Sequence, residues 1–319
     1  MALLDGLPAQ ATVVEVGPRD GLQNEAGPVP AAGKVAFIER LAAAGLPIVE
    51  VAAFVRPDTV PQMADAAEVV AALRRSEDRG RRSAVRRPHT RQTRYVALVP
   101  NLRGYHRARE AGAGEVAVFT AATETFSLRN THCSLAESLS RIAQVTAAAR
   151  ADGVPVRAYV SVAWRCPYEG PVDPQLVERL TGTLLDAGAW QVALGDTIGA
   201  ATPLEVVRLL ERLLAHAAPA QLALHCHDTR GAALANVLAA LQLGLSTFDA
   251  SAGGLGGCPF APGAAGNLAT ASLLYLLHGL GVETGVSLDA VAAATEPLEP
   301  YLGRPLSRAP WRGGARTGP

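Results

Sequence analysis

Hydrophobic residues along this chain follow two alternating patterns. Short runs rich in β-branched residues, typical of buried strands, recur through the sequence. Between them lie longer Ala- and Leu-rich stretches with apolar residues at i, i+3, i+4 and i+7, as in amphipathic helices. The predicted strands are residues 12–16, 48–54, 95–99, 115–120, 155–162, 190–194, 222–227 and 247–251. Eight strand–helix units in succession predict a TIM (β/α)8 barrel, with an open doubly wound α/β sheet as the alternative.

The ends of the predicted helices carry capping residues. Ser134, Asp173 and Thr202 each precede an amphipathic stretch and are N-cap candidates. The glycines expected to end helices are Gly45, Gly153, Gly188 and Gly244. We expect one barrel domain over residues 10–290. A short C-terminal extension over 291–319 is expected to be partly disordered, because its end is rich in Arg, Gly and Pro.

The composition is that of a globular protein without a dominant charge. The chain has 319 residues, of which 49% are hydrophobic, so it can bury a large core. Its formal net charge is zero, so no overall field attracts nucleic acid or an anionic membrane. No apolar stretch approaches the roughly 20 residues that span a bilayer, and no targeting segment is recognised. The four cysteines are widely spaced, which predicts reduced thiols and a cytoplasmic location.

One segment interrupts the alternation of strands and helices. Residues 74–94 carry nine arginines. This segment connects a helix to the next strand, which places it at the end of a TIM barrel opposite to the usual active site. We therefore interpret it as a solvated insert without packed structure, rather than as a site for phosphate or nucleic acid.

Polar side chains follow several predicted strands, and these positions share one face of a TIM barrel. His225 and His227 lie two residues apart on a strand, so both face one way and Cys226 faces the other. Asp20 follows the first strand, which lies close to them once the barrel closes. Asn267 can supply an amide oxygen, or alternatively cap the helix that follows it. These donors suit Mg²⁺ or Mn²⁺, with Zn²⁺ and Co²⁺ as alternatives.

Further candidates lie near the same face. Arg19 carries a permanent positive charge that can stabilise an oxyanion, unless it only forms a salt bridge with Glu50 or Asp196. Those two carboxylates lie at predicted strand ends, where they can pair with cationic groups or orient the histidines. Residues 253–267, GGLGGCPFAPGAAGN, place Cys258 in a glycine-rich loop with little core to pack against, which favours a functional thiol.

The chain resembles the 3-hydroxy-3-methylglutaryl-CoA (HMG-CoA) lyases of the DRE-TIM metallolyase superfamily. The resemblance covers residues 10–290 and is carried by the motifs VEVGPRDGLQNE, VPQM, PYEG, LGDTIG, HCHDTRGAALAN and GGLGGCPFAPGAAGNLAT. The isopropylmalate and homocitrate synthases resemble the chain around the histidines. They carry a Gly-Glu-Arg type sequence where this chain has Gly257-Cys258-Pro259.

The resemblance implies a retro-Claisen cleavage of HMG-CoA to acetyl-CoA and acetoacetate, as in leucine degradation. The implied metal ligands are Asp20, His225, His227 and Asn267. The implied catalytic residues are Cys258, Arg19, Asp20, Glu50, Asp196 and His225. Either Asp20 or His225 acts as the base in this interpretation, and Cys258 protonates the enolate. We expect Mg²⁺ or Mn²⁺ as the cofactor, an acyl-CoA thioester as the ligand and a homodimer.

The chain departs from that family at three places. Ala52-Ala53 stand where the lyases usually carry Thr-Ser, the loop reads PFAPGAAGN, and the Arg-rich insert is not typical. The first departure bears on the acyl group. A lyase or Claisen-type synthase acting on a different 3-hydroxy-3-alkylglutaryl-CoA or acyl-CoA is therefore the alternative. A catalytically silent metal-binding protein is the alternative from another class, and the presence of every ligand argues against it.

Overall fold

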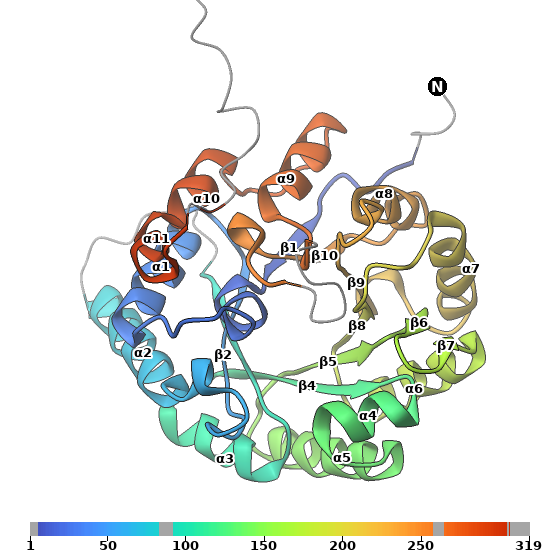
Figure 1. Cartoon of the computed structure of the whole chain (residues 1–319), viewed down its shortest axis with the longest axis horizontal. Helices are drawn as coiled ribbons and strands as arrows, with labels where there is room; N and C mark the ends of the chain where they lie inside the picture. Colours follow the sequence, from blue (N-terminus) through green and yellow to red (C-terminus); the bar gives the residue numbers. More distant parts are fainter. Residues whose placement is uncertain (1–5, 83–91, 258–264, 305, 307–319) are drawn as a thin grey trace, which may run out of the picture.

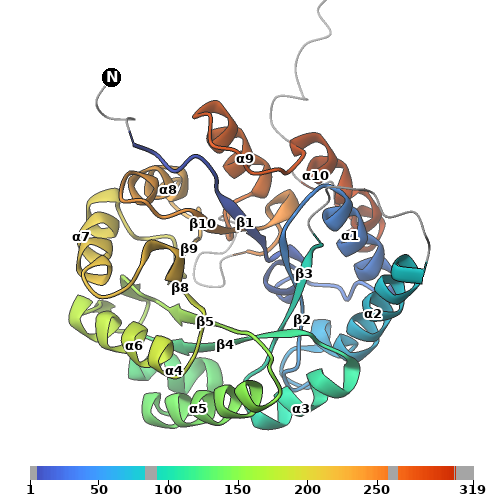
Figure 2. The same ribbon diagram turned by 180° about the vertical axis from the view of Figure 1, so that it is seen from behind.

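Parallel strands form a closed barrel at the centre of the molecule. The computed structural model describes residues 6–82, 92–257, 265–304 and 306. Within these residues, eight strands close in the order β1-β10-β9-β8-β5-β4-β3-β2. Helices form an outer ring around them, as Figure 1 and, from behind, Figure 2 show. The TIM barrel is confirmed, and the open sheet is excluded because β1 pairs with both β2 and β10.

The barrel strands begin and end within two residues of their predicted bounds. They are β1 (Thr12–Glu15), β2 (Ile48–Ala53), β3 (Arg94–Leu98), β4 (Glu115–Ala121), β5 (Val156–Ser161), β8 (Gln191–Asp196), β9 (Leu222–Cys226) and β10 (Thr247–Ala250). A short antiparallel hairpin, β6 (Arg165–Cys166) with β7 (Gly170–Pro171), follows β5. Helices cover the outside of the barrel and side chains fill its interior, so the strands are almost wholly buried and read as apolar runs.

The helices around the barrel begin and end as their caps predict. They are α1 (Ala31–Ala43), α2 (Ala66–Arg82), α3 (Leu102–Ala111), α4 (Glu124–Thr131), α5 (Leu135–Ala151), α6 (Pro174–Asp186), α7 (Pro203–Leu214), α8 (Ala233–Gln242) and α9 (Thr270–Gly279). The side chains of Ser134 and Asp173 accept hydrogen bonds from the first turns of α5 and α6. The predicted terminal glycines all adopt positive φ. None of the helices in the described ranges combines the length and apolarity needed to cross a membrane.

The arginine-rich segment is more regular than the sequence suggests. Residues 74–82 continue α2, in which Arg74 lies 3.7 Å from Asp78 one turn later. Arg94 begins β3 and donates hydrogen bonds to both carboxylate oxygens of Glu115, at 2.8 and 2.6 Å. The prediction of an unpacked insert is therefore wrong at both ends of the segment, because arginine favours helices and finds local carboxylate partners. Residues 83–91 lie outside the described ranges.

The chain after the barrel packs beside α1, as Figure 1 shows. It forms α10 (Leu288–Ala294), a 3₁₀ turn (Glu296–Leu298) and α11 (Glu299–Leu302). Leu298 is fully buried, and the Arg304 guanidinium lies 2.6 Å from the carboxylate of Glu25. Helix α10 runs across residue 290, so the described part of the extension continues the outer layer of the barrel. A separate domain over 291–319 and its partial disorder stay predictions.

Candidate metal and active site

A single π-helical turn, Gly17–Gly21, follows β1 and carries the first candidate residues. Glu15 anchors this turn, because its Oε1 accepts hydrogen bonds from the backbone N–H groups of Gly17 and Ala252, both at 2.8 Å. The Thr270 hydroxyl donates to the other oxygen at 2.7 Å. Burial raises the pKa of Glu15 to about 7. The turn after β1 is thus tied to the loop after β10 and to the start of α9.

Arg19 is buried between two carboxylates. Its Nε donates to Glu50 at the middle of β2, and Nη1 donates to Asp20 at 2.6 Å. Tyr159 of β5 donates its hydroxyl to the other Glu50 oxygen at 2.6 Å. Burial acts to lower the pKa of Arg19, but the two carboxylates raise it above its usual value, so the guanidinium stays charged. Of the two salt bridges considered for Arg19, the structure shows the one with Glu50.

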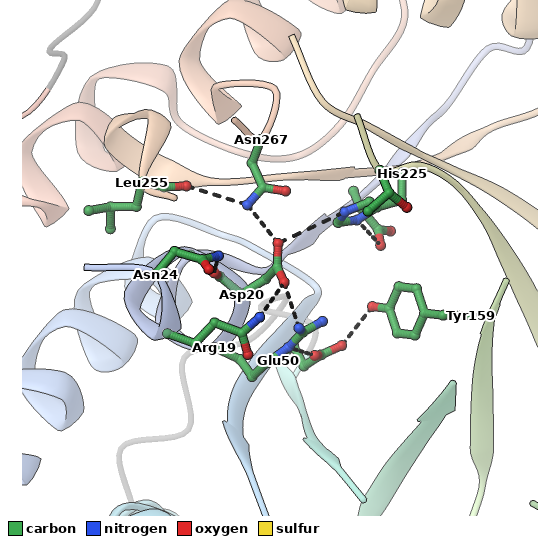
Figure 3. A network of polar contacts seen from close by, with 12 residues as sticks. Arg19, Asp20, Asn24, Glu50, Tyr159, His225, Leu255 and Asn267 are labelled. Carbon is green, nitrogen blue, oxygen red and sulfur yellow. Dashed lines mark hydrogen bonds and ion pairs between the residues drawn. The ribbon is translucent and has the colours of Figure 1, made fainter. Parts of the chain in front are cut away.

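The predicted metal ligands meet at the C-terminal end of the barrel. One potential ligand atom from each of Asp20, His225 and His227 lies within 4.8 Å of the others. The two imidazole centres are 5.5 Å apart, as expected for residues on one face of a strand end. Asn267 donates its Nδ2 to Asp20 at 2.7 Å, which Figure 3 shows together with the Asp20–His225 contact. Helix α9 has Ala269 at its N-cap, so the alternative that Asn267 caps it is wrong.

The electrostatics of these residues fit a divalent cation. Burial opposes the ionisation of Asp20, but Arg19 and the two imidazoles lower its pKa to about 2. Burial and the neighbouring His225 lower the pKa of His227 to about 4, which leaves a neutral ring. Nδ1 of His227 is buried and has no hydrogen-bond partner among the described residues. An anionic carboxylate, neutral imidazole and an unpaired buried nitrogen are donors for such a cation.

Two further residues predicted for the site are Asp196 and Cys258. The Asp196 carboxylate, at the end of β8, accepts hydrogen bonds from two backbone N–H groups of the following turn, at 2.9 and 3.1 Å. Burial raises its pKa. Asp196 is in register with Cys226 on the neighbouring strand β9. Burial raises the pKa of the Cys226 thiol well above its usual value. Cys258 lies outside the described residues.

The loop that contains Cys258 begins and ends close to the cluster. Gly257 and Ala265 pair as an antiparallel bridge, on either side of residues 258–264, which are not described. A Cβ on Gly266 would lie 2.3 Å from the carbonyl oxygen of Gly256, closer than side-chain atoms can approach. Glycine is therefore required where the two ends of this loop meet.

Sequence reasoning missed several polar residues that touch the candidates. Asp249 contacts His225, Arg157 contacts Asp249, and Tyr159 contacts Glu50. A signal for the first two was present, because each is a charged residue within a predicted buried strand and such a charge needs a partner.

Comparison with known proteins agrees with this geometry. The profile of the HMGL-like family matches residues 10–297. The cytoplasmic 3-hydroxy-3-methylglutaryl-CoA lyase of Danio rerio is 49% identical over 301 residues, covering 94% of this chain and 86% of that protein. A hydroxymethylglutaryl-CoA lyase structure from Pseudomonas aeruginosa is 46% identical, with a TM-score of 0.86 over 95% of this chain and 97% of that one.

A third relative was solved with small molecules. The HMG-CoA lyase from Acinetobacter baumannii, in complex with coenzyme A and 3-methylmalate, is 35% identical, with a TM-score of 0.85. The match covers 97% of this chain and 96% of that one. A family profile that spans most of the chain, and relatives that match it nearly from end to end, lead to one conclusion: the chain belongs to the HMGL-like family.

Proposed function

We propose that this protein is a divalent-cation-dependent lyase that cleaves HMG-CoA to acetyl-CoA and acetoacetate. The observation that carries the proposal is that the charged Arg19 lies next to the Asp20–His225–His227 cluster. Both are at the C-terminal end of the barrel, where TIM-barrel enzymes have their active sites. The names of the relatives, which are HMG-CoA lyases at 35–49% identity, support the same reaction.

The cluster would hold the cation through Asp20, His225 and His227, with Asn267 as the further ligand expected from the sequence. Oxygen and imidazole donors without thiolate favour Mg²⁺ or Mn²⁺. When bound, such a cation polarises oxygen atoms and so acidifies a substrate hydroxyl. Asp20 is an anionic member of the cluster, so it is a candidate to accept the hydroxyl proton, as is His225.

Loss of that proton starts the cleavage. The oxygen reforms a carbonyl group, the bond between C2 and C3 of the glutaryl chain breaks, and its electron pair passes to the thioester as an enolate. Arg19 stabilises the negative oxygen that develops, because Glu50 and Asp20 hold its guanidinium in one orientation. Acetoacetate is the second product.

The enolate carbon must then receive a proton, and we assign this step to Cys258. Support comes from the sequence, which places a thiol in the glycine-rich loop, and from the ends of that loop beside the cluster. Cys258→Ala should lower kcat by about 10²–10⁴ without loss of cation binding, the usual value of a positioned acid. The matched control is Cys226→Ala, a buried thiol between the two histidines. Full activity of Cys258→Ala would remove the thiol from the mechanism.

The experiment that tests the function is a product assay. Purified full-length protein with HMG-CoA and Mg²⁺ should form acetyl-CoA and acetoacetate in equal amounts, and a chelator should stop the reaction reversibly. A series of 3-hydroxy-3-alkylglutaryl-CoA thioesters tests the acyl group, since Ala52 and Ala53 are buried without hydroxyl groups. Faster cleavage of a longer thioester than of HMG-CoA would show that the longer thioester is the preferred substrate. If none of the thioesters is cleaved, the proposed function is refuted.

The cellular setting belongs to the same proposal. Free thiols at Cys133, Cys166 and Cys226 suit a reducing compartment such as the cytoplasm. Relatives are named both cytoplasmic and mitochondrial. We propose a homodimer, which light scattering of the purified protein would test.

A further inference from the structure

A buried carboxylate that the proposed reaction does not use lies behind His225. Asp249, in β10, is in register with His225 on the neighbouring strand β9. Its Oδ2 lies 3.2 Å from Nδ1 of His225. The side chain of Asp249 is fully buried, and that of His225 is 10% exposed. A buried carboxylate needs hydrogen-bond donors or cations to offset its loss of hydration, and the geometry of these partners indicates its role.

Asp249 is held on both oxygens from across the barrel. Arg157 of β5 donates Nη2 to Oδ1 at 2.7 Å and Nη1 to Oδ2 at 3.1 Å. Arg157 is itself fixed, because Nε donates to Gln191 at 3.0 Å and Nη1 also donates to the Tyr159 hydroxyl oxygen at 2.6 Å. A carboxylate that accepts hydrogen bonds from one guanidinium on both oxygens is paired with it as an ion, and the two contacts fix its orientation.

An ionised carboxylate can only accept a hydrogen bond, so Nδ1 of a neutral His225 must carry the hydrogen that points at Asp249. The lone pair is then on Nε2. That atom lies 3.9 Å from Oδ2 of Asp20, too far for a hydrogen bond. His227 differs, because its Nδ1 has no partner among the described residues. The barrel therefore fixes the tautomer of His225, whereas no contact in the described chain fixes that of His227.

We propose that Asp249, clamped by Arg157, is a positioning residue that fixes His225 as the Nδ1–H tautomer and aims Nε2 at the cation. Metal-binding histidines commonly donate their other ring nitrogen to a carboxylate, and loss of that partner weakens the metal site. The inference rests on the proposed function only in taking Asp20, His225 and His227 as the cation site.

The rival explanation is that Asp249 only neutralises Arg157 in the barrel core. Glu115 provides a matched control, because it is also a buried carboxylate held on both oxygens by an arginine, Arg94. It lies at the start of β4, at the opposite end of the barrel from His225. Asp249→Asn and Glu115→Gln make the same chemical change, and only the first alters a histidine contact.

The experiment uses the full chain labelled with ¹⁵N-histidine, free of metal, at a pH where both rings are neutral. Long-range ¹⁵N–¹H spectra should show His225 with its hydrogen on Nδ1, with the signals assigned by their loss in His225→Asn. Asp249→Asn should move most of this population to Nε2–H and weaken Mn²⁺ binding, measured by electron paramagnetic resonance, by about 10–100-fold. Glu115→Gln should change neither quantity.

Two results would overturn the proposal. One is a wild-type His225 with its hydrogen on Nε2, a result that does not depend on Asp249→Asn and so decides the matter even if that variant fails to fold. The other is an Asp249→Asn protein with the tautomer and Mn²⁺ affinity of the wild type. HMG-CoA takes no part in these measurements. An expected tautomer and affinity in a protein without lyase activity would refute the proposed reaction and leave the positioning role intact.

Discussion

Each end of the barrel pairs an arginine with a buried carboxylate, and the consequences differ. At the N-terminal end, Glu115 accepts two hydrogen bonds from Arg94 and one from Nε1 of Trp190, at 2.9 Å. The Arg94 guanidinium also lies 4.5 Å from the centre of the Trp190 ring. Both oxygens of this carboxylate are occupied by protein donors. This end is a closed arrangement that holds strands together.

At the C-terminal end the carboxylate is also paired on both oxygens, but a buried histidine nitrogen near it has no hydrogen-bond partner among the described residues. Asp20 accepts from Arg19, from Asn267 and from Gln23, the last at 3.1 Å. Nδ1 of His227 has no partner in the described chain. The comparison teaches that a buried carboxylate paired with an arginine does not by itself mark a functional site. The C-terminal end differs in that potential metal ligands from three residues lie within 4.8 Å of one another and one buried nitrogen among these residues has no partner in the described chain.

The largest expected effect is the loss of a ligand at the C-terminal end. His227→Ala should weaken Mn²⁺ binding by more than about 100-fold, beyond the usual effect of losing a residue behind a ligand, and abolish lyase activity at low cation concentration. Titration followed by electron paramagnetic resonance measures the affinity. His278→Ala, which changes an exposed histidine of α9, is the control. Equal affinities in the two variants would place the cation elsewhere.

A smaller effect is expected when the cationic group next to the cluster is changed. Arg19→Gln should lower kcat by about 10²–10³ with little change in KM, because its charge matters most when the enolate forms. Steady-state kinetics with HMG-CoA measure both constants. Arg94→Gln, which changes the arginine at the other end, should retain the kcat of the wild type. A raised KM with unchanged kcat would make Arg19 a substrate anchor.

The smallest expected effect lies at the closed end. Glu115→Gln should lower the free energy of unfolding by about 1–2 kcal/mol, because a charged acceptor of three hydrogen bonds is lost and its arginine partner is partly exposed. Urea denaturation measures this change. The kcat of the folded variant should equal that of the wild type. A loss of activity in fully folded Glu115→Gln protein would show that the two ends are coupled and break the comparison.

Much of the fold could be predicted because local patterns specify it. A strand that is covered on both faces is apolar at most of its positions, and the covering helices show the helical period and N-cap residues such as Ser134 and Asp173. The histidine pair could be predicted too, since residues two apart on a strand share a face. The arginine-rich segment shows the limit of composition. Its ends join α2 and β3, where Arg74 lies near Asp78 and Arg94 donates to Glu115, and composition alone does not reveal such pairs.

The contacts between distant strands could not be predicted from one sequence. Asp249 reaches His225 only because β10 and β9 pair in a particular register, and Arg157 reaches Asp249 only across a closed barrel. Asp196 is a carboxylate at a strand end that the sequence predicts to serve catalysis. Its oxygens bind the N–H groups of the next turn, and its proposed part in catalysis stays untested.

The most direct test of the account is to locate the cation. Crystals of the full chain grown with Mn²⁺ should show, in anomalous scattering, one peak in contact with Asp20, His225 and His227 at the C-terminal end of the barrel. The same crystals should show no peak at Arg94, Glu115 and Trp190. A peak away from the three ligands, or none at a Mn²⁺ concentration that supports activity, would contradict the claim that this end of the barrel is the metal-dependent active site.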